Sequence, residues 1–343
     1  MGFGLFLDGN RFKAIIVNNR TICSLTIKVS NMRLKEITST GRTLVPNQFR
    51  VNPDSILRKI LAYGLYPILL AAIGTTIVLA IQLQWDFKAV YWKTTLILVL
   101  TLMILETIFP LSRSWSMTGQ SLRRDLSYIL FVGPTIGLTK AAFGWLFIGY
   151  SQAHTGPMTH WPVAAATVTF LLIFEFFQYW FHRISHRSNG PLGRFLWKIH
   201  LAHHLPDKVY VMMHAVFHPI NAIISTAIIQ IPLLLLGAPP AAMLAATLLI
   251  DLQSLISHFN VTIRAGWFNY IFMGTETHRF HHSAKIDEAG NFGNTLVIWD
   301  LLFGTFLYRP GQVPEKLGVE KTDNMPRSER VFEVLAFPFR ANT

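Results

Sequence analysis

Six long apolar segments constrain the fold of this 343-residue chain more than any other feature. A helix that crosses a bilayer needs about 20 mostly apolar residues. The segments that meet or approach this length are residues 60–83, 94–111, 126–150, 161–181, 215–237 and 241–257. The third is the weakest because Pro134, Lys140 and four glycines interrupt it, and Pro239-Pro240 divides the last two into a hairpin. The sequence therefore predicts an all-α, polytopic transmembrane bundle with four to six crossings.

The composition agrees with a membrane protein and limits its ligands. Hydrophobic residues make up 51% of the chain and charged residues only 14%, whereas soluble domains carry about 25% charged residues. The net charge of +12 comes from Lys and Arg beside the apolar runs, which favours anionic lipid headgroups over nucleic acid as the partner. The single cysteine, Cys23, excludes an internal disulfide and a thiolate metal cluster. Any metal must be bound through nitrogen and oxygen.

The distribution of charge predicts which ends of the helices face the cytoplasm. With a cytoplasmic N-terminus, the inside segments 1–59, 112–125, 182–214 and 258–343 hold 27 of the 30 Lys and Arg residues, as the positive-inside rule requires. His154 and His160 then lie on the opposite side and are expected to be ordinary loop residues. We expect residues 1–59 to be a basic cytoplasmic segment, amphipathic or disordered. Residues 60–150 form the N-terminal transmembrane helices, and residues 151–343 form a catalytic domain with a C-terminal cytoplasmic cap.

The histidines predict the chemistry. Eleven of the 13 lie in three stretches, at residues 182–218, at 258 and at 278–282. They form one HxxxH and two HxxHH motifs. Imidazole is the commonest neutral metal ligand and suits iron, zinc and copper. Residues three and four apart share a helix face, and the two rings of an adjacent pair can reach different metals. We therefore expect a cytoplasmic cap that holds a histidine-rich di-metal site.

The expected ligands are His182, His186, His200, His203, His204, His218, His258, His278, His281 and His282. The alternatives are a histidine that caps a helix C-terminus or a histidine-rich surface patch. Neither explains why the motifs keep the phase of a helix. His214 is equally compatible with a ligand and with a loop residue.

Two acidic residues are candidates for a supporting role. Glu175 and Asp251 each precede a histidine, His182 and His258, by seven residues, which is about two helical turns. Ionisable groups in apolar segments are costly and are usually functional or paired. Each carboxylate is expected to orient an imidazole or to bind metal directly, and a salt bridge to Lys140 is the alternative. Glu106 has no histidine in phase and is expected to serve packing or a salt bridge.

Over residues 160–309 the chain resembles the superfamily of fatty acid hydroxylases and sterol desaturases, which are integral-membrane di-iron enzymes. The motifs that carry the resemblance are residues 179–186, 200–204, 218–219, 258–260, 278–283, 291–294 and 299–305, with an acidic residue at position 175. The resemblance implies a helical bundle with a cytoplasmic cap, two irons held mostly by histidine, and oxygen-dependent attack on a lipid C–H bond.

Such an attack needs an oxidant that side chains do not supply. The expected activity is therefore di-iron hydroxylation of a membrane lipid or sterol-like substrate with molecular oxygen, and desaturation by the same site is the nearest alternative. Electrons are expected from a separate ferredoxin or small cytochrome with its reductase, because the sequence has no evident heme or flavin motif. Zinc can replace iron in purified protein. The expected location is the bacterial inner membrane or the endoplasmic reticulum.

Two other classes of protein also use histidine-bound metals. A zinc-dependent membrane hydrolase usually carries a helical motif such as HExxH, which this sequence lacks. A metal transporter needs ligands near the middle of the bilayer, whereas these histidines are expected at one boundary.

Overall fold

The computed structural model describes residues 2–8, 11–18, 21–28, 55–153, 155–320 and 324–340. The chain divides into two compact units, Met1–Arg42 and Thr43–Thr343. The helices and the histidine motifs all belong to the second unit.

The first unit contains a three-stranded antiparallel sheet. Its strands are β1 (Gly2–Asp8), β2 (Arg11–Asn18) and β3 (Thr21–Lys28), in the order β1-β2-β3. Ile15 of β2 pairs with Gly4 of β1 and with Ser24 of β3. The strands contradict the disordered tail that was one of the two expectations for this segment. Short β-branched runs such as Ile15-Ile16-Val17 suit the pleated surface of a sheet better than a helix.

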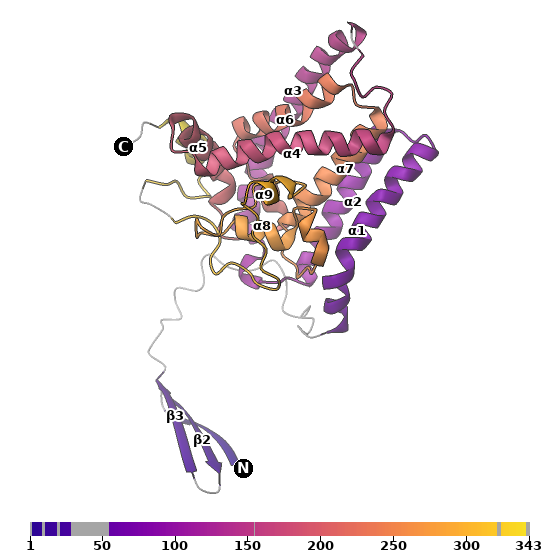
Figure 1. Ribbon diagram of the computed structural model, residues 1–343. Coiled ribbons are helices and arrows are strands. Elements are labelled where there is room, and N and C mark those ends of the chain that lie inside the picture. Colours follow the sequence, from indigo (N-terminus) through magenta and orange to yellow (C-terminus); the bar gives the residue numbers. More distant parts are fainter. Residues whose placement is uncertain are drawn as a thin grey trace. The chain divides into compact units, whose positions relative to one another are not determined.

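The second unit is a helical bundle (Figure 1). Its long helices are α1 (Ile56–Gln82), α2 (Phe87–Ile108), α3 (Gly119–Ala153), α4 (Val163–Arg187), α6 (Pro219–Leu236) and α7 (Pro240–Ser257). Among the described residues, six helices are long and apolar enough to cross a membrane. They coincide with the six predicted segments, so the helical bundle is confirmed. The third is one continuous helix through Pro134.

Local signals in the sequence explain where these helices begin and end. The Ser55 hydroxyl and the Asp86 carboxylate accept hydrogen bonds from backbone N–H groups of the first turns of α1 and α2. Pro219 and Pro240 occupy the first positions of α6 and α7, where a missing N–H costs nothing. Gly237 ends α6 in the left-handed region, at φ 62°, and it packs so closely on another backbone segment that a Cβ atom would not fit.

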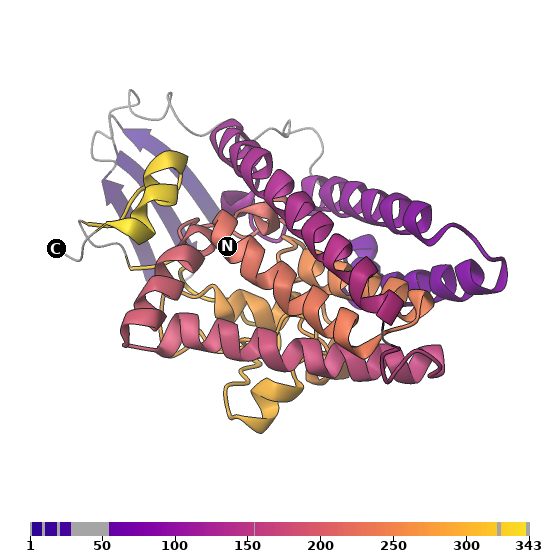
Figure 2. The same ribbon diagram turned by 90° about the horizontal axis from the view of Figure 1, so that it is seen from above.

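Helix α7 lies at the centre of the bundle, in contact with α1, α2 and α4. In the apolar part of α7, 67% of the residues are buried, against 6% in that of α3. Figure 2 shows α3 crossing over α6, with α4 on the other side of the α6–α7 pair. Large apolar side chains are exposed on α3, such as Leu130 and Leu138, at 72% and 73%. Exposure of this kind is expected where a helix faces lipid.

Shorter elements form a cap at one end of the bundle. They are α5 (Pro191–His204), η3 (Val211–Ala215), η4 (Gly266–Tyr270), α8 (Thr275–His281), α9 (Ile298–Leu302), α10 (Val331–Ala336) and η5 (Phe337–Phe339). The cap contacts the C-terminal parts of α4 and α7 (Figure 1). The Leu111 N–H after α2 donates to the Asn260 carbonyl after α7 at 2.7 Å, and the Arg264 N–H donates to Ala62 of α1 at 2.7 Å. The histidine-bearing segments therefore meet at one end of the bundle.

Candidate metal centre

Nine histidines form two groups where this cap meets the ends of α4 and α7. The first group consists of His182, His186, His200, His204 and His281, and the second of His203, His258, His278 and His282. Within each group, the candidate ligand nitrogens all lie within 4.8 Å of one another. The structure thus brings together nine of the ten predicted ligands.

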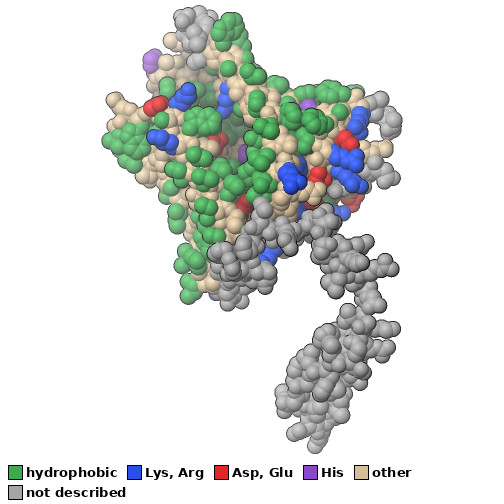
Figure 3. Space-filling view, turned by 180° about the vertical axis from the view of Figure 1, so that it is seen from behind, with side chains coloured by type: hydrophobic (Ala, Val, Ile, Leu, Met, Phe, Trp, Pro, Cys, Tyr) green, Lys and Arg blue, Asp and Glu red, His purple; other side chains and the backbone are tan. Residues whose placement is uncertain are grey.

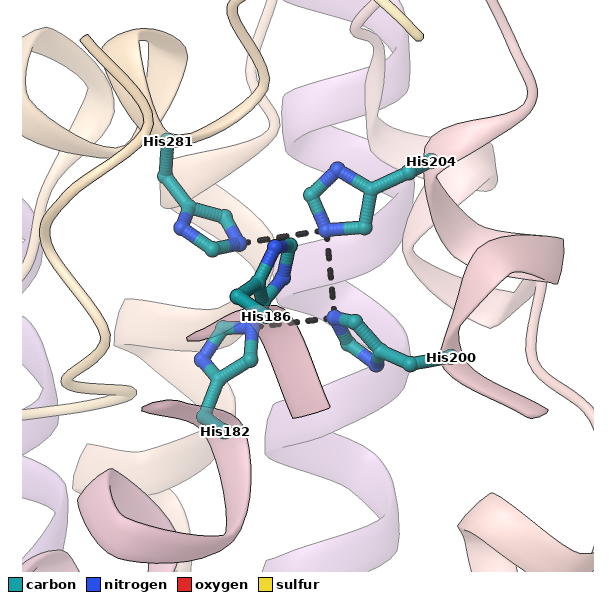
Figure 4. A group of neighbouring side chains, drawn as sticks. All are labelled: His182, His186, His200, His204 and His281. Atoms are coloured by element: carbon teal, nitrogen blue, oxygen red, sulfur yellow. Dashed lines mark hydrogen bonds between the residues drawn. The ribbon is translucent and has the colours of Figure 1, made fainter. Parts of the chain in front are cut away.

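The first group is assembled from three helices. His182 and His186 lie one turn apart near the end of α4, and His200 and His204 lie one turn apart on α5. His281 comes from the end of α8. Figure 4 shows the five rings converging from these separate segments. Helix α4 extends past the predicted apolar segment, which places the HxxxH pair on one face of a regular helix.

The two HxxHH motifs are divided between the groups. His200 and His204 point into the first group while His203 points into the second. His281 belongs to the first group, and its neighbour His282 to the second. Adjacent helical residues point about 100° apart, so each motif serves both groups at once. This division holds the two groups side by side.

The hydrogen bonds of the first group show that its ring nitrogens fit a metal ion. The Nδ1 atom of His182 lies 2.8 Å from the Phe292 carbonyl oxygen, and that of His200 lies 3.1 Å from the side-chain oxygen of Asn221. Both oxygens only accept, so both Nδ1 atoms carry the proton and both Nε2 atoms present lone pairs. These two Nε2 atoms are 2.9 Å apart, and a dashed line joins them in Figure 4. Neither atom has a proton to share, so their lone pairs repel each other, and a bound cation would remove this repulsion.

The second group repeats this arrangement. The Nδ1 atom of His203 donates to the Val216 carbonyl at 3.2 Å, and that of His258 donates to the Ser254 carbonyl at 2.9 Å. Their bare Nε2 atoms are 3.0 Å apart. Backbone carbonyls that fix the tautomer of an imidazole are the usual support of metal-binding histidine. Both groups therefore fit a metal ion.

Burial keeps these rings neutral, which is the form that binds metal. It lowers the pKa of His258 to about 3. For the other rings beyond the membrane-spanning helices, burial and then the neighbouring imidazoles hold the pKa well below its ordinary value. These are His200, His203, His204, His278, His281 and His282.

Glu175 supports the first group through the backbone and does not touch a ring. Its fully buried carboxylate accepts hydrogen bonds from the N–H groups of Asn294 and Thr295, the latter at 2.9 Å. These residues follow Phe292, whose carbonyl orients His182, by two and three positions. Glu175 belongs to neither histidine group. The expected direct contact with an imidazole or a metal is thus replaced by a bond to the supporting loop.

Asp300 also holds this loop, and the sequence predicted no role for it. Its carboxylate accepts from the N–H groups of Phe292 and Gly293, at 2.7 and 2.8 Å. The Gly290 carbonyl in this loop accepts a hydrogen bond from Nδ1 of His281 at 2.8 Å. In the sequence, Asp300 stood out only as part of residues 299–305, a motif that resembles the superfamily. Its role could not be predicted from spacing, because its partners lie seven and eight residues away in an irregular loop.

Asp251 lies in a different part of the bundle. Its carboxylate accepts a hydrogen bond from the Thr95 hydroxyl of α2 at 2.9 Å. Close by, the Lys140 ammonium lies 5.8 Å from the centre of the Tyr91 ring. Asp251 belongs to neither histidine group. The structure therefore gives it a pairing role between helices in place of the expected support of His258.

Glu106 binds backbone groups of the cap. Its carboxylate accepts from the N–H groups of Val211, at 3.0 Å, and of Asn260, at 3.4 Å. The ion pairs found among the described residues do not include it. Glu106 thus fastens the turn η3 and the end of α7 to α2 by hydrogen bonds, whereas packing or a salt bridge was expected.

The remaining histidines lie outside both groups. His218 caps α6: its Nδ1 accepts from the Ile220 N–H and its Nε2 donates to the Leu335 carbonyl, both at 3.1 Å. Because both ring nitrogens are engaged, the structure gives His218 a capping role in place of the expected ligation. His214 lies beside the second group, with its ring centre 5.4 Å from that of His258. His160 is exposed between α3 and α4, and His154 lies outside the described residues.

Comparisons with known proteins identify the family. The family model "Fatty acid hydroxylase" matches residues 167–305. The ornithine lipid hydroxylase OlsE of Rhizobium tropici is 31% identical over 249 residues, which cover 69% of this chain and 72% of that protein. The chain belongs to the fatty acid hydroxylase family. All nine histidines of the two groups lie within the residues that the family model matches.

Other members of the fatty acid hydroxylase family are similar over shorter regions. The very-long-chain aldehyde decarbonylase GL1-11 of Oryza sativa subsp. japonica is 25% identical over 188 residues, or 54% of this chain and 67% of that protein. The alkylglycerol monooxygenase of Homo sapiens is 30% identical over 135 residues, or 38% of this chain and 28% of that protein. No solved structure matches the chain.

Proposed function

We propose that this protein is an integral-membrane di-iron enzyme that uses molecular oxygen to hydroxylate a C–H bond of a membrane lipid. One observation carries the proposal: two adjacent groups of mostly buried imidazoles, in which bare ring nitrogens face one another at the end of an apolar bundle. The names of two relatives, an ornithine lipid hydroxylase and an alkylglycerol monooxygenase, agree with it.

Each group would hold one metal ion. An all-nitrogen set of neutral donors accepts iron, zinc or copper, and we propose iron because oxidation of a C–H bond needs a redox metal. When bound, the two irons supply the oxygen-derived oxidising power that no side chain has. Zinc is expected as an occasional replacement in purified protein.

The protein's own part is to orient the rings and to exclude water. The Phe217 ring stacks on His203, with ring centres 4.3 Å apart and planes within 9°. The Phe292 ring packs against His182 and His281, with centres 5.8 Å from each. Such apolar covers keep bulk water from a reactive centre. Figure 3 shows a hollow bordered by hydrophobic side chains, with a histidine visible inside, and this is where we expect a lipid tail to enter.

We further propose that the metal-binding end faces the cytoplasm, in the bacterial inner membrane or the endoplasmic reticulum. The sequence supports this orientation, because 27 of the 30 Lys and Arg residues fall on that side. Electrons would come from a separate ferredoxin or small cytochrome with its reductase. A basic cytoplasmic surface suits an acidic donor of this kind.

Desaturation is the alternative outcome of the same site, since it differs only in whether a second hydrogen is removed. A zinc-dependent hydrolase is less well supported. Zinc hydrolases of the HExxH type use a glutamate as the general base, whereas Glu175 and Asp300 are both hydrogen-bonded to backbone N–H groups.

The test is lipid mass spectrometry of cells with and without the gene, grown under ¹⁸O-labelled oxygen. We expect a lipid that gains one labelled oxygen atom only when the gene is present. The His203→Ala variant should abolish this product, and the exposed-site variant His160→Ala should keep it. A lipid that loses two hydrogens would instead identify a desaturase. Lipids that are identical with and without the gene would refute both.

A further inference from the structure

Among the described residues of the cap, His214 is half-buried and is explained neither by the two groups nor by a helix cap. It lies on the 3-10 turn η3, beside the second group. The two groups are unequal, with five imidazoles in the first and four in the second. His214 is therefore a candidate for the imidazole that the second group lacks.

The position of the His214 ring suits this role. Its centre is 5.4 Å from that of His258, while the centres of two established members, His278 and His282, are 4.6 and 5.2 Å from the same ring. The Nδ1 atom of His214 is buried and has no hydrogen-bond partner among the described residues. A buried ring nitrogen without a partner is costly. Turning it toward a metal ion would break no existing hydrogen bond.

The turn that carries His214 is built against the second group. The Val216 carbonyl, two residues on, accepts the Nδ1 proton of His203. The Phe217 ring stacks on His203 and meets the His214 ring edge-on, with centres 6.1 Å apart. The start of the turn is fastened to α2, where Glu106 accepts the Val211 N–H at 3.0 Å. The turn is thus held where it orients one ligand and presents another ring.

We propose that His214 is a fifth imidazole for the metal ion of the second group, so that both ions have five histidine ligands. This inference rests on the proposed function, because it needs both groups to bind metal. The proposed role needs a ring nitrogen of His214. A role in packing or in contact with the lipid would need only the shape of the ring.

The experiment compares three variants of the full-length protein loaded with ⁵⁷Fe. His214→Phe keeps an aromatic ring but removes both nitrogens, and His214→Ala leaves space for added imidazole. His160→Ala is the matched control, since it removes an exposed histidine at the other end of the bundle. The readouts are iron per chain, the rate at which a chelator removes each iron, and the Mössbauer spectrum.

In the wild type we expect two irons per chain. In His214→Phe, one of the two irons should dissociate at least about tenfold faster, which is the usual effect of removing a residue that supports a metal site. One of the Mössbauer doublets should also change. Imidazole should restore that iron in His214→Ala. Wild-type release rates in both variants would overturn the proposal. Equal acceleration of both irons in His214→Phe would also overturn it, since that indicates a packing defect. A wild type without two metal ions would overturn the proposed function as well.

Discussion

The Glu175→Gln substitution tests how the protein supports the first metal ion. Both oxygens of the buried carboxylate face backbone N–H donors, those of Asn294 and Thr295. Glutamine has the same shape but only one oxygen, so one donor is left facing an NH₂ group. A buried donor that loses a charged acceptor costs about 1.5–3 kcal/mol. At 1.4 kcal/mol for each factor of ten, this loosens the loop that orients His182 by roughly 10- to 100-fold.

The assay is the release of each iron to a chelator from the purified protein. Reference variants His186→Ala and His203→Ala assign the two phases of release to the first and second groups. We expect Glu175→Gln to accelerate the first phase by roughly 10- to 100-fold and to leave the second unchanged.

The comparison is Glu106→Leu, because one oxygen of the buried Glu106 carboxylate accepts both backbone N–H groups and leucine removes that acceptor. The two residues that Glu106 binds lie beside the second group, so Glu106→Leu should accelerate the second phase of iron release. The reasoning is refuted if Glu175→Gln releases both irons at wild-type rates. It is equally refuted if the two variants weaken the same iron.

Three further predictions concern pH, capping and salt. Burial lowers the pKa of His258 from 6.5 to about 3, so the unfolded chain binds more protons between these values, and the metal-free protein should lose stability as pH falls below about 6.5. The loss is about 1.4 kcal/mol per pH unit for such a ring, and a melting temperature that stays constant from pH 7 to 5 would contradict it. His218→Ala should keep both irons but lower stability by about 0.5–2 kcal/mol through the lost cap of α6, measured by thermal melting, and loss of an iron would show that His218 is a ligand. Turnover with an acidic electron donor should slow as salt rises, and salt-independent turnover would exclude electrostatic docking.

The membrane helices were predictable because the bilayer imposes a length and a composition that a sequence shows directly. The break at Pro239-Pro240 was equally readable, since α6 ends at Leu236 and α7 begins at Pro240. The strands of residues 2–28 were missed. Their signals, short apolar runs separated by Gly9-Asn10 and Asn19-Arg20, were present but were outweighed by the basic charge of the segment.

The nine grouped histidines followed from spacing, but the supporting carboxylates did not. Glu175 and Asp251 each stand seven residues before a histidine, yet one binds the loop after Phe292 and the other binds Thr95. Spacing along a helix fixes which side a residue occupies, and the partner on that side comes from a distant segment. His218 lies just before Pro219 at the start of α6, a position that favours a helix cap. The spacing of the histidines alone does not distinguish such a cap from a metal ligand.

The iron K-edge X-ray absorption spectrum of the iron-loaded protein tests the central claim most directly. The account predicts two irons per chain, each surrounded by nitrogen and oxygen, with the outer-shell scattering of several imidazole rings and no sulfur. Fewer than two tightly bound irons, or a spectrum without imidazole scattering, would contradict the claim that these histidines build a di-metal centre.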